Sequence, residues 1–147
     1  MTTSVRQVLE AKGSAALSLP PGATVYEALE LMAKNDVGSV VVADGDCLLG
    51  IFTERDYARK LILQGRSSKD TQVSDLMTSN ILTVSPTQTI DDCMAMITDN
   101  RVRHLPVVEK GRLVGIISIG DVVKAVIADQ QRTIQQLSSY IAGDISA

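Results

Sequence analysis

The stretch Gly115-Ile116-Ile117-Ser118-Ile119-Gly120-Asp121 has an earlier copy in Gly50-Ile51-Phe52-Thr53-Glu54-Arg55-Asp56. In each copy an apolar run ends in a hydroxyl residue, and an aspartate follows three positions later. This spacing is typical of a capping box, in which a Ser or Thr and an acidic side chain satisfy the first backbone N–H groups of a helix. Each copy is therefore predicted to be a strand that turns directly into a helix.

The similarity extends well beyond these two motifs. Residues 17–62 align without a gap with residues 82–127, at a constant offset of 65 residues. Further identical pairs at this offset are Pro21/Pro86, Thr24/Thr89, Asn35/Asn100, Val37/Val102, Val42/Val107 and Leu48/Leu113. The chain is a tandem of two copies of one unit, so binding sites are expected in pairs.

Apolar runs and turn signals predict the order strand–helix–strand–strand–helix in each copy. In the first copy the strands are expected at 17–19, 37–43 and 47–52, with a helix that ends near Asn35 and another from Thr53 to Gly65. In the second copy they are expected at 81–84, 102–108 and 112–117, with a helix after Thr89 and a final helix that runs past the repeat. Short helices are predicted near residue 8 and at 73–77.

These elements divide the chain into a first repeat at 5–65, a polar linker at 66–72, a second repeat at 73–128 and a C-terminal helical extension at 129–147. One repeat is too small to bury its sheet alone. We therefore expect an α/β (α+β) protein in which two repeats pack sheet to sheet, with ligand sites in the cleft between them.

Composition and charge exclude several classes of partner. The 147 residues carry a formal net charge of −3, which argues against nucleic acid or an anionic membrane as a partner. No stretch approaches the length of a membrane span, and the N-terminus has no apolar signal core, so a cytoplasmic protein is expected. Cys47 and Cys93 stand at non-equivalent repeat positions without a C-x-x-C pair, so no structural metal is expected.

No motif of a known enzyme class is present. Gly45 and Gly50 have Walker spacing, but Ile51-Phe52 follows where a P-loop has Lys and Ser or Thr, and no G-x-G-x-x-G occurs. His104 is the single histidine and stands on a predicted strand without a nucleophile motif nearby. The chain is therefore not expected to be an enzyme.

The two strand-to-helix motifs suit a different task, the binding of a nucleotide. A helix start offers unpaired N–H groups and a positive dipole end to a phosphate. An aspartate beside it can accept hydrogen bonds from the two vicinal hydroxyls of a ribose. The alternative is that Asp56 and Asp121 only cap their helices, as many such residues do.

The two copies resemble a pair of CBS domains, the tandem also called a Bateman module. The resemblance is carried by the two motifs quoted above and by Arg103-His104-Leu105-Pro106-Val107-Val108, and it runs from about Val5 to Ile127. The runs at 53–60 and 103–106 are similar to stand-alone bacterial CBS-pair proteins. The resemblance implies two β-α-β-β-α repeats related by pseudo-twofold symmetry. It also implies a regulatory ligand of the adenosine type, with AMP as the first candidate and ADP, ATP, an NAD-type molecule or S-adenosylmethionine as the others.

In that family the aspartate holds the ribose hydroxyls, and the Thr or Ser lies near the phosphate. The resemblance places these roles on Asp121 and Ser118 at one site and on Asp56 and Thr53 at the other. It adds as further contacts Ile119, Gly120, Arg103, His104, Lys12 and Pro106 around the first of these, and Arg55 at the second.

The family builds each site from both repeats. The segment that enters the short strand of one copy lines the adenine pocket of the other copy. By this rule Ala15, Ala16 and Leu17 belong to the Asp121 site, and Asn80, Ile81 and Leu82 belong to the Asp56 site. The first copy has Gly38-Ser39 where the second has Arg103-His104, so the two sites are expected to differ in strength.

Two functional hypotheses follow. The first is an adenine-nucleotide sensor that forms a homodimer and signals to an unknown regulated protein. The second is a structural interaction module whose nucleotide cleft is vestigial. For either, the apolar stripe Ile127, Ile134, Leu137 and Ile141 extends past the repeat and needs a covering surface, which we expect to be a second subunit.

Overall fold

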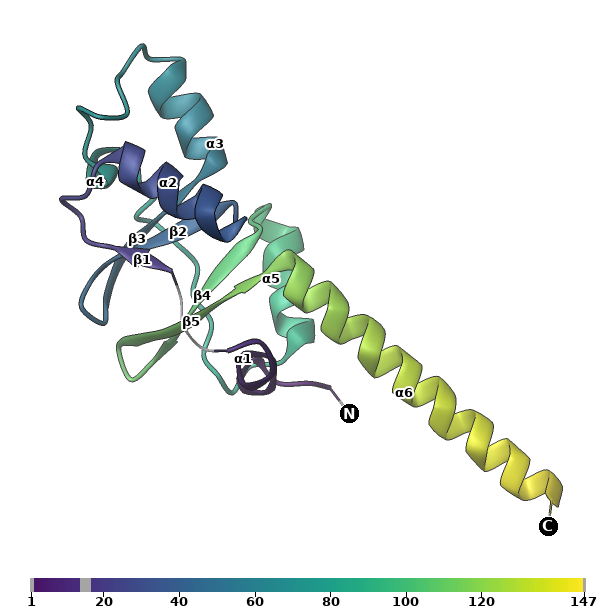
Figure 1. Ribbon diagram of the computed structural model, residues 1–147. Coiled ribbons are helices and arrows are strands. Elements are labelled where there is room, and N and C mark those ends of the chain that lie inside the picture. Colours follow the sequence, from purple (N-terminus) through teal and green to yellow (C-terminus); the bar gives the residue numbers. More distant parts are fainter. Residues whose placement is uncertain (1, 14–16, 147) are drawn as a thin grey trace.

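A computed structural model describes residues 2–13 and 17–146 of the chain. The two repeats form neighbouring lobes whose strands lie between them, and one long helix projects away from the second lobe (Figure 1). β3 and β5, the last strands of the two repeats, contact each other. The expected pairing of two repeats is therefore confirmed.

The first repeat forms a three-stranded sheet in the order β1-β2-β3. Its elements are β1 (Ser18–Leu19), α2 (Val25–Asn35), β2 (Ser39–Asp44), β3 (Cys47–Thr53) and α3 (Glu54–Asp56). α3 passes into a π-helix at Tyr57–Ile62, where the sequence predicted one regular helix, and Gly65 follows with a φ of 68°. The short helix α4 (Val73–Leu76) comes after the linker.

The second repeat contains α5 (Ile90–Asn100), β4 (His104–Glu109), β5 (Arg112–Ser118) and α6 (Ile119–Ser146). Both hairpins have the same irregularity, a register shift at Val42/Ala43 in the first and at Val107/Val108 in the second. Because these positions are related by the repeat offset, the two copies match in backbone detail as well as in sequence.

The strand expected at 81–84 does not form in the described structure, apart from one bridge between Val84 and Val107. In the first repeat the N–H of Val41 donates to the carbonyl of Leu17 at 2.9 Å, which holds β1 beside β2. The repeat equivalent of Val41 is Pro106, which has no N–H to donate. The second sheet consequently keeps only β4 and β5.

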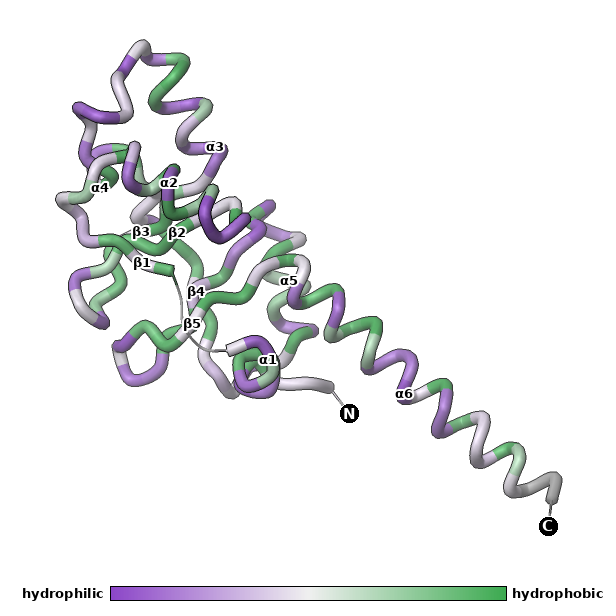
Figure 2. Tube along the Cα trace, viewed as in Figure 1, coloured by the Kyte–Doolittle hydropathy of each residue, from purple (hydrophilic) through white to green (hydrophobic). Residues whose placement is uncertain are grey.

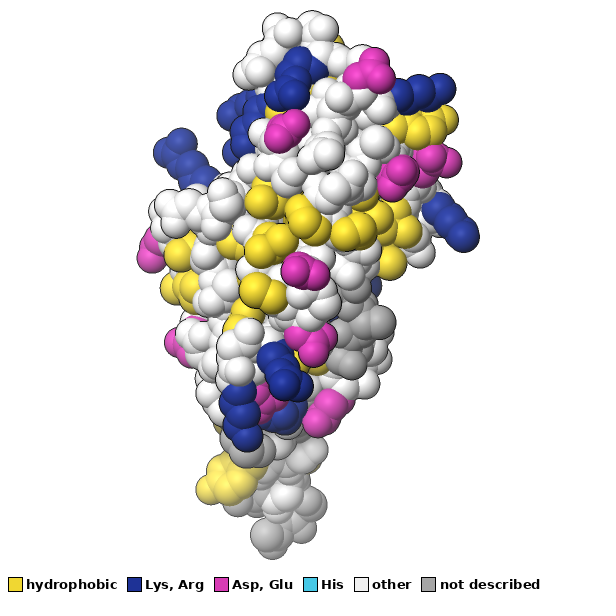
Figure 3. All heavy atoms as spheres, turned by 90° about the vertical axis from the view of Figure 1, so that its left-hand side faces the viewer, with side chains coloured by type: hydrophobic (Ala, Val, Ile, Leu, Met, Phe, Trp, Pro, Cys, Tyr) yellow, Lys and Arg dark blue, Asp and Glu magenta, His cyan; other side chains and the backbone are white. Residues whose placement is uncertain are grey.

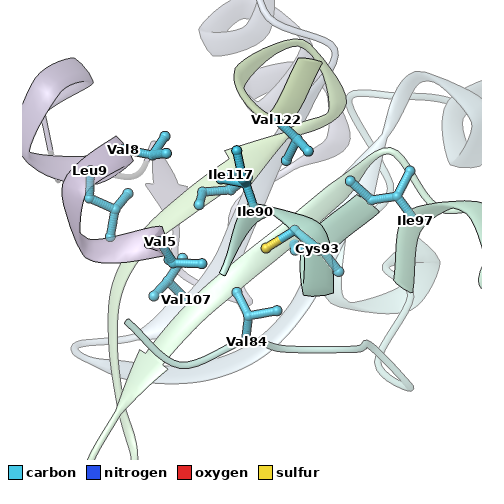
Figure 4. Packing of buried hydrophobic residues seen from close by; sticks show 11 residues of the cluster. Val5, Val8, Leu9, Val84, Ile90, Cys93, Ile97, Val107, Ile117 and Val122 are labelled. Carbon is cyan, nitrogen blue, oxygen red and sulfur yellow. The ribbon is translucent and has the colours of Figure 1, made fainter. Parts of the chain in front are cut away.

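The two short helices are exchanged between the hydrophobic cores. α1 (Val5–Lys12) precedes the first repeat, yet its buried Val5, Val8 and Leu9 pack in the core of the second, as Figure 4 shows. α4 does the reverse, with Val73 and Leu76 in the core of the first repeat. Each core is thus completed by a helix from outside its own repeat, so the lobes are tied together through their interiors.

From Ile127 onward, α6 leaves its large apolar side chains uncovered. Along the projecting helix, hydrophobic and hydrophilic positions alternate at short intervals (Figure 2). The exposed large apolar side chains there are Ile127, Ile134, Leu137, Tyr140 and Ile141. The predicted stripe is therefore present and exposed in the single chain.

A second face of the molecule also carries apolar side chains. Figure 3 shows them gathered across the middle of that face, with many of the charged side chains above and below. Within the described ranges, no helix is both long enough and apolar enough to cross a membrane.

Candidate functional site

Asp121 lies in the first turn of α6, directly after the strand β5. Its Oδ2 accepts a hydrogen bond from the backbone N–H of Ser118 at 2.9 Å, and its own N–H donates to Ser118 Oγ at 3.1 Å. This reciprocal pair is the predicted capping box. The capping function of Asp121 is therefore confirmed. Its other oxygen, Oδ1, takes no part in the cap.

A lysine from the other end of the chain reaches the same carboxylate. Lys12, the last residue of α1, places Nζ 2.6 Å from Asp121 Oδ2 and 3.0 Å from the carbonyl oxygen of Ile116. Burial raises the pKa of Asp121, but the hydrogen bonds from Lys12 and Ser118 outweigh it, and the pKa lies below its usual value. Asp121 is thus a carboxylate at neutral pH, and it is 20% exposed.

Two further predicted residues border this carboxylate. His104 pairs with Ser118 across the β4–β5 hairpin, and the carbonyl of Arg103 accepts the N–H of Ile119 at 2.8 Å. Burial lowers the pKa of His104; the charge of Asp121 opposes this, and the charges of Lys12 and Arg103 reinforce it. His104 is therefore uncharged at neutral pH, Lys12 is the cation in direct contact with Asp121, and the charge of Arg103 lies close enough to act on His104.

Asp56, the equivalent residue of the first repeat, has a different environment. Its Oδ2 accepts from the backbone N–H and the hydroxyl of Thr53, at 3.1 and 3.2 Å. Its Oδ1 lies 3.0 Å from Lys60 Nζ and accepts the Thr78 hydroxyl at 3.1 Å. The Asp56 side chain is only 8% exposed. Both oxygens of Asp56 are engaged inside the protein.

The other residues expected at these sites fall into four groups. Arg55, Ile119 and Gly120 are exposed at the two helix starts, and a side chain at Gly120 would meet Ser118 Oγ at 3.6 Å, an ordinary contact. Asn80, Ile81 and Leu82 follow Thr78, which itself touches Asp56. The carbonyls of Leu17 and Pro106 accept hydrogen bonds from Val41 and Val84. Ala15 and Ala16 lie outside the described residues.

Lys60 and Thr78 are the functional neighbours that the sequence reasoning missed. Asp56 and Lys60 are four residues apart on one helix, a spacing that favours ion pairs and could have been read from the sequence. Thr78 gave no such signal, because it lies 22 positions from Asp56 and reaches it through pairing of Thr78 with Ile51. Lys60 and Thr78 both contact Oδ1 of Asp56, the oxygen that the capping box leaves unused.

Two open cavities lie on the described surface, away from both aspartates. One of about 300 Å³ borders the outer side of α1 and includes Gly13, next to Lys12. The other, of about 460 Å³, lies among the N-terminal segment, the start of α5 and the middle of α6, and includes Ile134. Neither cavity is lined by Asp56 or Asp121.

The family model of the CBS domain matches the chain twice, over residues 2–63 and 73–128. The chain belongs to the CBS-domain family. Its fold is accordingly a tandem CBS pair, as the resemblance implied. No group of residues suited to a metal ion occurs in the described part of this CBS pair.

Curated relatives support the assignment. The "CBS domain-containing protein CBSX3, mitochondrial" of Arabidopsis thaliana is 42% identical, over 97% of this chain and 73% of that protein. The "CBS domain-containing protein YhcV" of Bacillus subtilis is 33% identical, over 71% of this chain and 74% of that protein.

Solved structures agree. A protein with CBS domains from Burkholderia ambifaria MC40-6 is 51% identical with a TM-score of 0.82, covering 87% of this chain and 96% of that one. The CBS domain pair of protein MJ0100 in complex with 5′-methylthioadenosine and S-adenosyl-L-methionine has a TM-score of 0.77, over 88% and 99% of the chains. At 21% identity, the latter shows a common fold alone.

Proposed function

We propose that this CBS pair is a regulatory protein that binds an adenosine-containing nucleotide at Asp121 and reports its presence to a regulated protein. The observation that carries the proposal is the partly exposed Asp121 carboxylate at a helix start, with Lys12 in contact with it and the charge of Arg103 acting on the neighbouring His104. A carboxylate can hold two ribose hydroxyls, while cations and a helix N-terminus suit phosphate oxygens. AMP is the first candidate, and ADP, ATP and NAD-type molecules present the same groups.

The proposal assigns one nucleotide to each chain rather than two. Asp56 is nearly buried, and its oxygens already accept from Thr53 and Thr78 and pair with Lys60. A ribose at Asp56 would have to replace internal contacts, one of which comes from Thr78 in the segment that follows α4 and pairs with β3. We therefore assign the regulatory ligand to the second repeat.

The adenosine class is supported by the complex of the MJ0100 pair with two adenosine-containing molecules. The single histidine, His104, is uncharged and lies within reach of the Asp121 charge, so we assign it to the ligand site rather than to a catalytic role. A sensor without catalytic activity, acting in the cytoplasm without nucleic acid or membrane, is accordingly the function that we infer.

The second candidate is a structural interaction module. The closed Asp56 site favours it, because one of the two nucleotide sites is filled by the protein itself. The uncovered stripe of α6 favours it as well. Ligand binding separates the two candidates.

Melting in the presence of nucleotides is the test. A ligand at 100 times its Kd that binds only the folded state stabilises it by about 2.7 kcal/mol. For a chain of this size that corresponds to a rise in Tm of roughly 5–10 °C. We expect this rise with millimolar AMP, ADP or ATP. If none of these, nor NAD or S-adenosylmethionine, changes the Tm, the structural module is the better account.

We also propose that the stripe of α6 is the interface of a homodimer. Ile127, Ile134 and Ile141 are spaced by seven residues with Leu137 between them, the pattern of a two-stranded coiled coil. Between residues 130 and 143 the only charged residue is Arg132, which pairs with Asp129 of its own helix. Two copies of this helix can therefore meet without repulsion.

Replacing Leu137 by aspartate is expected to convert the dimer to a monomer, because a charge would be buried between the two α6 helices. Sedimentation velocity at micromolar concentration measures the change. Gln136→Asp is the matched control, since it adds the same charge one residue away, outside the stripe. A wild-type protein that is already monomeric at this concentration would exclude the interface.

A further inference from the structure

Lys12 occupies the part of Asp121 that a ribose would need. Oδ2 of Asp121 accepts from the Ser118 N–H at 2.9 Å and from Lys12 Nζ at 2.6 Å. A carboxylate oxygen has two lone-pair sites, so these two donors fill Oδ2. A ribose that uses both oxygens of Asp121 must therefore displace Lys12.

Displacement leaves an ammonium group that has lost its carboxylate. The Lys12 side chain is 35% exposed, and Arg103 adds a second positive charge in the same neighbourhood. Glu54 of the first repeat is the other acid in this neighbourhood, but its carboxylate lies beside Gly38. The carboxylate carbon of Glu54 is 3.7 Å from where a Cβ at Gly38 would stand. A freed Lys12 is stabilised best by an anion that arrives with the ligand.

We propose that Lys12 makes the Asp121 site selective for ligands that carry phosphate. The ribose hydroxyls of a nucleotide replace Lys12 on Asp121, and the released ammonium binds the phosphate. Adenosine has no anionic group to offer Lys12. S-adenosylmethionine carries no phosphate; it offers a single carboxylate, and its sulfonium and ammonium groups make the molecule a net cation. This inference rests on the proposed function and goes beyond it, because it states which adenosine compounds the site rejects.

The test is a set of affinities for AMP, adenosine and S-adenosylmethionine, measured by calorimetry on the full chain. For the wild type we expect AMP to bind at least about tenfold more tightly than adenosine or S-adenosylmethionine, as a charge-assisted contact implies. In Lys12→Met, AMP should bind more weakly and adenosine more tightly, which reduces the ratio to below about threefold. Arg6→Met is the matched control, because Arg6 is a cation of the same helix that pairs with Glu109 instead.

The opposite changes for the two ligands distinguish this account from simpler ones. If Lys12 only contacts phosphate, Lys12→Met should leave adenosine binding unchanged. If Lys12 only holds α1 in place, Lys12→Met should weaken the binding of both ligands. Either result overturns the inference. Equal affinities of wild type for AMP and adenosine overturn it without any variant, while the proposed function stands. If no adenosine compound binds the wild type, the proposed function fails too.

Discussion

Replacing Asp121 by asparagine is expected to weaken AMP binding at least tenfold. The asparagine keeps a side-chain oxygen that can cap α6, so the helix start should survive. It loses one of two charged acceptors for the ribose hydroxyls, and a hydrogen bond to a charged group contributes roughly 1.5–3 kcal/mol. Since about 1.4 kcal/mol is a factor of ten in Kd, a calorimetric titration resolves the change easily.

Asp56→Asn is the matched control for this variant. It alters the equivalent residue of the first repeat, whose oxygens already face Thr53, Lys60 and Thr78. We expect a lower Tm from the lost ion pair and unchanged AMP affinity. The ligand offers a second control, because 2′-deoxy-AMP should bind wild type more weakly than AMP and lose that disadvantage in Asp121→Asn. Equal binding of the two ligands by wild type would leave Asp121 as a helix cap only.

Gly50→Ala is expected to destabilise the fold strongly. A Cβ at Gly50 would lie 2.7 Å from Met77 Sδ and 2.8 Å from the Thr78 carbonyl oxygen, so the segment after α4 must move. That segment is held to β3 by two hydrogen bonds between Ile51 and Thr78, at 2.8 and 2.9 Å. Overpacking of this kind costs about 1–3 kcal/mol, which for this chain lowers Tm by roughly 3–10 °C.

The control for Gly50→Ala is Gly22→Ala. A Cβ at Gly22 would meet nothing within 4 Å, so this substitution should change Tm by little. Thermal unfolding followed by circular dichroism compares the two variants. A Gly50→Ala protein as stable as Gly22→Ala would show that the segment at Thr78 does not need the close approach at Gly50.

The features that could be predicted from the sequence are those that local spacing determines. The capping boxes at Thr53/Asp56 and Ser118/Asp121 span four residues each, so the pattern alone identified both helix starts. The repeat offset then predicted two equivalent units, because identical residues at a constant spacing require the same local structure. That the two sites differ in strength stays a prediction from the sequence, since the second copy carries Arg103-His104 in place of Gly38-Ser39.

The features that could not be predicted depend on contacts between distant segments. Nothing local to α1 or α4 says that each completes the core of the other repeat. The resemblance placed Lys12 at the Asp121 site, but its ion pair with Asp121 and the contact of Thr78 with Asp56 depend on that exchange, which carries both segments across to the opposite repeat. The missing strand at 81–84 was visible in principle, because Pro106 stands where an N–H donor is needed.

Calorimetric titration of AMP into the wild-type protein tests the central claim most directly, because it counts the sites. Asp121 is open to a ribose once Lys12 moves, whereas Asp56 is engaged by the protein itself. The account therefore predicts one AMP bound per chain. An absence of binding, or two equivalent molecules of AMP per chain, would contradict it.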